Sequence, residues 1–187
     1  MKNVDVPPGE DHKSEIIMKK RICNFVDNKE KIKQNHGGMM KEYSFYGWKD
    51  ANCAPEKELY KGIENPRDLY DALSEVWCAK TCASRMRDDW TKENKTLGQC
   101  SITAFLVQDI FGGKVYGIER PDGNVHCYNV IGNSTFDLTS EQFGDEKLDY
   151  SDNPEQFREV HFANDEKKNR YELLKQRLQE YITHTGV

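Results

Sequence analysis

The stretch 96–111, Thr-Leu-Gly-Gln-Cys-Ser-Ile-Thr-Ala-Phe-Leu-Val-Gln-Asp-Ile-Phe, constrains the fold more than any other part of the chain. Its apolar residues after Ser101 cover nearly the whole circumference of a helix, which is typical of a helix buried on most sides. A polar, glycine-containing loop precedes this helix, and Cys100 stands at the junction. The sequence therefore predicts a helix that crosses the core and begins at a cysteine.

A thiol in the first turn of such a helix faces the positive end of the helix dipole and backbone N–H groups without intrahelical partners. Both features favour a thiolate, and the N–H groups can also bind a developing oxyanion. Cys100 is therefore a candidate nucleophile. The alternative is that Cys100 is a small apolar residue at the start of a core helix, since free cysteines are often buried.

Length and charge exclude several classes of protein. A chain of 187 residues with a net charge of -5 fits one main domain with an appendage, and this charge argues against a nucleic-acid partner. Because the N-terminal residues contain no long apolar run, we expect neither a signal peptide nor a membrane partner, and we predict a cytoplasmic location. The six cysteines are then expected to be reduced thiols.

Residues 1–38 are predicted to form a polar N-terminal extension, as a weak helix or a disordered segment, and residues 39–187 a single α+β domain. Asn65-Pro66 is typical of a helix start, so a helix is expected from Pro66 to about Arg87.

Cys78 and Cys82 would then share one face of that helix. No second Cys or His pair stands at a zinc-binding spacing, so we expect no metal and no other cofactor.

The second half of the chain predicts a small antiparallel meander. Glycine-containing turns separate three expected strands at Lys114–Glu119, Val125–Ile131 and Ser134–Leu138. Further elements are expected beyond the meander: a helical turn at Thr139–Gly144, a short helix from Asn153-Pro154, an edge strand at Val160–Phe162 and a long helix from Asp165 to about Thr183.

The expected register places two polar residues on one sheet face. If Gly132-Asn133 forms a two-residue turn, Tyr128 lies opposite Asp137 and His126 lies opposite Thr139. His126 and Asp137 are then diagonal neighbours, roughly 7 Å apart at the backbone. If this face packs against the Cys100 helix, His126 can take the thiol proton while Asp137 orients the imidazole. The alternative is that each residue is only a structural hydrogen-bonding group.

These residues resemble those of a known family. The resemblance covers about residues 66–162 and lies in Gly98-Gln99-Cys100, Val107-Gln108-Asp109, Phe111-Gly112-Gly113, His126, Asn129 and the run Asp137-Leu138-Thr139-Ser140-Glu141-Gln142-Phe143. In these motifs the chain resembles the YunG-like bacterial proteins, a family of unassigned function. A cysteine at a helix start followed by a strand His and an Asp on the next strand is also similar to the papain-like and transglutaminase-like superfamily of cysteine hydrolases.

The resemblance implies a papain-like or transglutaminase-like core with Cys100 as nucleophile, His126 as base and Asp137 as the orienting group. It also implies an oxyanion hole formed in part by the Cys100 backbone N–H, with Trp90 or Gln99 as the second donor. One departure concerns the residue after the nucleophile. Transglutaminases usually have an aromatic residue where Ser101 stands, so transfer to an amine is not implied.

The function expected from these features is that of a thiol-dependent acyl hydrolase or transferase. It would act on an amide or thioester of an unidentified peptide or small molecule, through a thioester on Cys100. The alternative is a non-catalytic module that binds a peptide or small ligand in a groove around Trp90, Cys100 and His126. A metal site that includes Cys127 ranks last, because Cys127 would lie on the opposite strand face from His126. The sequence does not indicate the oligomeric state.

Overall fold

The computed structural model describes residues 41–186, and the compact unit that it contains begins at Glu42. The extension predicted at residues 1–38 lies outside the described residues. The unit has an α+β fold with the following elements: α2 (Pro66–Val76), η1 (Ser84–Asp89, a 3-10 helix), α3 (Cys100–Phe111), β1 (Lys114–Glu119), β2 (Val125–Ile131), β3 (Ser134–Phe136), η2 (Ser140–Phe143, also 3-10), α4 (Arg158–Phe162) and α5 (Asp165–Thr185).

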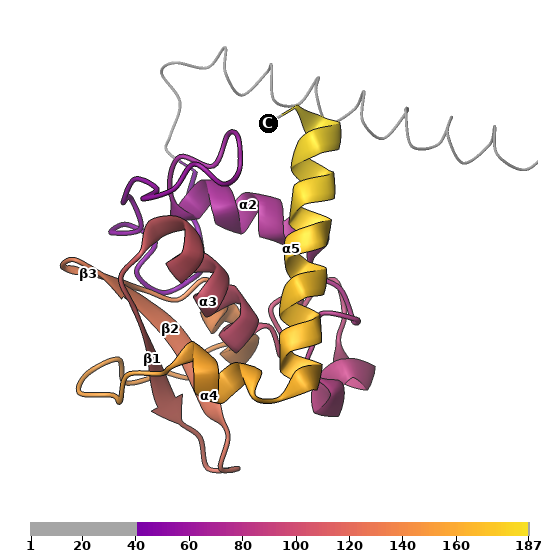
Figure 1. The fold of residues 1–187 in the computed structure, drawn as a ribbon. Helices are drawn as coiled ribbons and strands as arrows, with labels where there is room; N and C mark the ends of the chain where they lie inside the picture. The colour runs from indigo at the N-terminus through magenta and orange to yellow at the C-terminus, as the bar shows by residue number, and fades with distance from the viewer. Residues whose placement is uncertain (1–40, 187) are drawn as a thin grey trace, which may run out of the picture. The chain divides into compact units, whose positions relative to one another are not determined.

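Helix α3 is the centre of the unit. Figure 1 shows it between the sheet and α5, and it packs against β1 and β2 on one side and α5 on the other. Nine of its twelve residues are buried, which confirms a helix that is apolar around most of its circumference. The helix begins at Cys100, as predicted, and ends at Phe111, because the next residue, Gly112, adopts a positive φ of 72°. The nucleophile candidate is thus attached to a rigid core element.

Helix α2 begins as predicted but is shorter than expected. The Asn65 side chain accepts hydrogen bonds from the first turn, and the Asp68 carboxylate accepts one from the Asn65 N–H, which completes a capping box. The helix ends at Val76 because Trp77 turns into the core, where its indole N–H donates to the Thr103 hydroxyl at 3.2 Å.

The shorter helix corrects the prediction for the two cysteines that follow it. Cys78 and Cys82 lie beyond the helix end and do not share a helix face. Thr81 organises their turn, because its hydroxyl accepts from the Cys78 N–H at 3.0 Å. Within residues 41–186, no group of three or more His, Cys, Asp or Glu side chains is arranged to hold a metal ion.

The sheet confirms the predicted order and register of the meander. The three strands lie in the order β1-β2-β3, and Ile131 pairs with Ser134, Val130 with Thr135 and Asn129 with Phe136. Strand β3 ends at Phe136, two residues earlier than predicted. Asp137 pairs instead with Tyr46, whose carbonyl accepts from the Asp137 N–H at 3.0 Å. The pairing expected between Tyr128 and Asp137 therefore does not form.

The edge of the sheet differs from the prediction. Residues 154–156 run along β1, where the Gly117 N–H donates to the Pro154 carbonyl and the Gln156 N–H donates to the Val115 carbonyl. This segment takes the edge position, so the predicted helix at Asn153-Pro154 is wrong. The edge strand predicted at 160–162 is also wrong, because these residues form part of α4.

Helix α5 confirms the long charged helix that the sequence predicts. Asn164 caps its first turn by accepting from the Lys167 N–H at 3.0 Å, and its buried stripe packs against α2 and α3. No helix in the described part of the chain is both long and apolar enough to cross a membrane. The N-terminus of α5 lies beside α4 and contributes to the cleft described next.

Candidate active site

A cleft of about 690 Å³ opens beside the N-terminus of α3. It is lined by Cys100 and Ser101 from α3, by residues of η1, by the 120–126 turn with the start of β2, by Gln142 and Phe143 of η2, and by residues between Gln156 and Arg170. Cys100 and His126 both line this cleft. The two residues therefore border the same space.

The start of α3 leaves its backbone donors open. Gln99, the residue before the helix, has a helical conformation and its side chain does not cap the first turn. The first N–H groups of a helix have no intrahelical acceptor, so those at Cys100 and Ser101 can bind an oxygen atom in the cleft. The Cys100 sulfur lies 4.0 Å from the Val125 carbonyl oxygen, at the start of β2.

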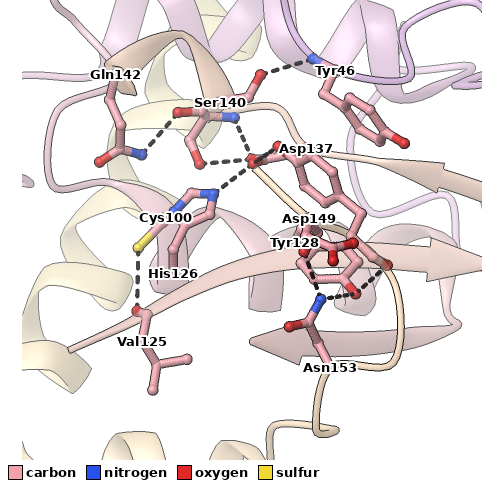
Figure 2. Close-up of polar contacts among 12 residues, drawn as sticks. Tyr46, Cys100, Val125, His126, Tyr128, Asp137, Ser140, Gln142, Asp149 and Asn153 are labelled. Carbon is pink, nitrogen blue, oxygen red and sulfur yellow. Dashed lines mark hydrogen bonds and ion pairs between the residues drawn. The ribbon is translucent and has the colours of Figure 1, made fainter. Parts of the chain in front are cut away.

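His126 and Asp137 form a buried pair. The His126 Nε2 atom lies 2.5 Å from Asp137 Oδ2, and both residues are at most 2% exposed. Figure 2 shows this contact beside the Cys100 side chain. The other ring nitrogen, Nδ1, is buried and has no hydrogen-bond partner among the nitrogen and oxygen atoms of the described residues. The ring edge also packs against the Phe143 ring, at a centroid distance of 4.6 Å. The orientation of the imidazole is thus fixed, and its Nδ1 atom remains without a hydrogen-bond partner.

The thiol and the imidazole shift each other's pKa in opposite directions. Burial opposes ionisation of Cys100, but the hydrogen bond and positive charge of His126 outweigh it and lower the thiol pKa. Burial also opposes the charged form of His126, but the Asp137 carboxylate and the interaction with Cys100 raise its pKa to about 10. These shifts favour a thiolate beside an imidazolium, which is the reactive form of a cysteine nucleophile.

Asp137 accepts hydrogen bonds from three residues. Oδ1 accepts from the Thr139 N–H at 2.9 Å and from the Thr139 hydroxyl at 3.0 Å. Oδ2 accepts from the Tyr150 hydroxyl at 3.0 Å, in addition to its contact with His126. The Tyr150 ring stacks on Tyr46 at a centroid distance of 3.8 Å, which fixes the hydroxyl. The carboxylate is therefore held in one orientation.

Trp90 and Gln99 do not lie where the oxyanion prediction requires them. The Trp90 indole N–H donates to the Lys95 carbonyl at 3.0 Å, outside the cleft. Gln99 is fully buried and its side-chain N–H donates to the Cys78 carbonyl at 3.2 Å. Both side-chain N–H groups thus donate to backbone carbonyls rather than into the cleft. Cys127 points into the hydrophobic core, away from the cleft.

The structure brings in two residues that sequence reasoning missed. Tyr150 comes from a polar loop, and its only signal was a lone aromatic residue between polar neighbours. Gln142 links η2 to the loop before the nucleophile, since its Oε1 accepts from the Gly98 N–H at 3.3 Å and its Nε2 donates to the Thr139 carbonyl at 2.8 Å. The Asp137–Phe143 motif quoted above thus connects the acid to the nucleophile loop.

The profile of the family described as YunG protein matches residues 65–183, nearly two thirds of the chain. The chain belongs to the YunG family. The YunG match extends from the cap of α2 into α5 and includes Cys100, His126 and Asp137.

Among curated proteins, the chain is similar to the "Uncharacterized protein YunG" of Bacillus subtilis (strain 168). The two are 46% identical over 54 residues, which is 29% of this chain and 46% of that relative. The chain thus matches less than half the length of this YunG protein. No solved structure matches the chain.

The Tyr150 hydroxyl should stabilise the buried pair measurably. Tyr150→Phe removes one donor from the Asp137 carboxylate, and we expect the free energy of unfolding to fall by about 1.5 kcal/mol, as for a hydrogen bond to a charged group. Urea denaturation measures this change. Tyr116→Phe is the matched control, because Tyr116 stacks on Tyr128 by its ring and no hydrogen bond of its hydroxyl is found in residues 41–186. Equal effects of the two substitutions would contradict this role for Tyr150.

Proposed function

We propose that this protein is a thiol-dependent acyl hydrolase or acyltransferase that acts on an amide or thioester through Cys100, His126 and Asp137. The observation that carries the proposal is that the two nitrogens of the His126 ring have different environments. Nε2 is bound to Asp137, whereas Nδ1 is left for the thiol, and the interaction with His126 lowers the pKa of Cys100. A histidine with a purely structural role would have both nitrogens satisfied by the protein.

The first half of the reaction forms a thioester. The Cys100 thiolate attacks the carbonyl carbon of the substrate, and the electron pair of the C=O bond moves to oxygen. The backbone N–H groups at the start of α3 stabilise this oxyanion. The oxyanion then reforms the carbonyl, the bond to the leaving nitrogen or sulfur breaks, and protonated His126 donates its proton to the leaving group.

The second half releases the acyl group. Water, or an acceptor in the transferase case, attacks the thioester while neutral His126 accepts the proton of the incoming nucleophile. The C–S bond breaks, and the carboxylic acid or transferred acyl product leaves. Cys100 is then again a thiolate beside an imidazolium. Asp137 orients the imidazole and stabilises its charged form throughout.

We further propose that the fold is related to the papain-like and transglutaminase-like hydrolases. Three features support this relation. The cysteine begins a central helix, the helix packs against an antiparallel sheet, and the His and Asp follow in order from β2 and from the end of β3. The relation is one of topology and side-chain order, which is how catalytic triads recur on different scaffolds.

An acylation experiment tests the proposed function without knowledge of the substrate. p-Nitrophenyl acetate offers an activated acyl group, so we expect release of about one equivalent of p-nitrophenolate in a burst, followed by slower turnover. Mass spectrometry should place the acetyl group on the Cys100 peptide. Cys100→Ala should show neither burst nor adduct. Acetylation of Cys53 or Cys78 at the same rate as Cys100 would contradict the proposal.

A further inference from the structure

One wall of the cleft carries a lysine that is held by a neutral histidine. Lys167 Nζ lies 3.1 Å from His161 Nδ1, and His161 Nε2 lies 3.0 Å from Gln156 Oε1. An ammonium group can only donate, so Nδ1 is the acceptor and Nε2 carries the proton that is donated to Gln156. The Gln156 Nε2 atom donates to the Pro154 carbonyl, which fixes the side-chain oxygen toward His161.

His161 cannot neutralise the lysine. The ring is buried and packs edge-on against Phe105, and burial together with the Lys167 charge lowers its pKa to about 4. It therefore remains uncharged at neutral pH. This arrangement orients the ammonium group while leaving its full positive charge and its other N–H groups available.

Two of the other cations of the cleft are paired with carboxylates. Arg170 is paired with Glu166 at 2.9 Å, and Arg120 is paired with Glu146 at 2.8 Å, whereas Arg85 also lines the cleft and forms no ion pair within residues 41–186. Lys167 likewise forms no ion pair with an Asp or Glu of residues 41–186. Lys167 and Cys100 line the same cleft. Lys167 is thus a cation of the cleft with no carboxylate partner among the described residues.

We propose that Lys167 binds a carboxylate of the substrate, so that the compounds acylating Cys100 are amides or thioesters that carry a carboxylate. This inference rests on the proposed function and assigns its substrate class. A monoanion fits better than a dianion such as a phosphate ester. The carboxylates of Asp122 and Glu166 also line the cleft and would repel a doubly charged group more strongly.

The test uses alkylating reagents in which only the charge changes. N-Iodoacetyl derivatives of glycine, β-alanine and 4-aminobutyrate carry a carboxylate at increasing distance from the reacting carbon, and their primary amides are neutral analogues. In each case the Cys100 sulfur displaces iodide and forms a thioether. For at least one chain length we expect the acid to react about 5- to 10-fold faster than its amide, as for a partly buried ion pair. Peptide mass spectrometry gives the rate at Cys100.

Variants assign this preference to one residue. Lys167→Met and Lys167→Gln should both reduce the acid-to-amide rate ratio to about 1, whereas Lys167→Arg should keep most of the preference. Lys168→Met removes the same charge from the exposed next position and should leave the ratio unchanged. A ratio that is the same in wild type and in both neutral Lys167 variants would overturn the inference. A phosphonate analogue that reacts faster than every carboxylate and depends on Lys167 would overturn the choice of carboxylate.

Failure of the inference can be separated from failure of the proposed function. An unactivated Cys100 would show in the absolute rates at pH 6, which would then be no higher than those of an ordinary thiol. The charge preference is a ratio, and it is also measurable at pH 9, where an ordinary thiol is largely ionised. The ratio therefore tests Lys167 whether or not the thiol is activated.

Discussion

His126→Ala should slow the alkylation of Cys100 by iodoacetamide at pH 6 by about 10- to 100-fold. The thiolate is the reacting species, and in the wild type the interaction with His126 outweighs burial and lowers the thiol pKa. Without His126, burial and the Asp137 charge raise the thiol pKa and only the Cys127 backbone N–H lowers it. Even an ordinary thiol with a pKa of about 8.5 is ionised to only about 0.3% at pH 6. A low-pKa thiolate is intrinsically less nucleophilic, which offsets part of this factor.

The pH profile gives a sharper result than the single rate. Thiolate forms as the pH rises through the thiol pKa, so the wild-type rate should reach its plateau at lower pH than that of an ordinary thiol. The His126→Ala profile should shift to higher pH, and the two rates should approach each other above about pH 9. Alkylation of each cysteine is followed by mass spectrometry of its peptide.

Two references control this experiment. Cys53 is half-buried, and burial raises its pKa, so it should react slowly at pH 6 in the same sample. His184→Ala removes an exposed histidine from the end of α5 and should leave the Cys100 profile unchanged. If Cys100 and Cys53 have the same pH profile, or if His126→Ala leaves that of Cys100 unmoved, the catalytic proposal fails and the binding module becomes the better description.

Local sequence rules predicted the geometry of the pair well. Gly132-Asn133 forms the expected tight connection, and this turn sets every pairing between β2 and β3. Side chains alternate between the two faces of a strand, so the register also determines which residues face α3. His126 and Asp137 meet even though Asp137 has left the β3 ladder, because the chain continues in the same direction for one more residue.

The predictions that failed concern contacts with distant residues. Helix α2 ends at Val76 because Trp77 gains a buried position and a hydrogen bond to Thr103, 26 residues away. Helical periodicity carries no information about such a partner. The partner of β1 at the sheet edge likewise depends on a distant segment. Residues 154–156 pair with β1, whereas residues 160–162 are part of α4.

The hydrogen-bond donors around Asp137 could also not be predicted from the sequence. Thr139 was predicted as the start of a helical turn, but its N–H and hydroxyl bind the Asp137 carboxylate, and no side-chain cap forms at η2. Tyr150 reaches the same carboxylate from a loop 13 residues later. Buried carboxylates need several donors, so a search for donors near Asp137 becomes possible only once the fold is known.

Asp137→Ala should lower the free energy of unfolding by about 3 to 5 kcal/mol. The carboxylate is 1% exposed and accepts from His126, from two groups of Thr139 and from Tyr150. Its removal leaves these donors buried without an acceptor and leaves the imidazolium without its counter-ion. Removal of one partner from a buried ion pair is strongly destabilising, because the other charge remains buried. Urea denaturation at pH 7 measures the loss. Asp145→Ala is the control, because Asp145 is exposed and should change stability by no more than about 0.5 kcal/mol.

The pH dependence of stability tests whether Asp137 holds the proton on His126. Burial lowers the pKa of His126, and the Asp137 carboxylate together with Cys100 overcomes this and raises it from 6.5 to about 10. A group whose pKa rises on folding contributes stability that is complete below its unfolded pKa and is lost as the pH rises through the folded one. In Cys100→Ala protein the thiol no longer titrates and no longer raises the His126 pKa. The free energy of unfolding should therefore fall as the pH rises from about 6.5 through the raised pKa that Asp137 alone maintains, which lies below the wild-type value. Adding Asp137→Ala should remove most of this fall. Equal pH slopes with and without the carboxylate would mean that Asp137 holds the ring in place but does not stabilise its charge.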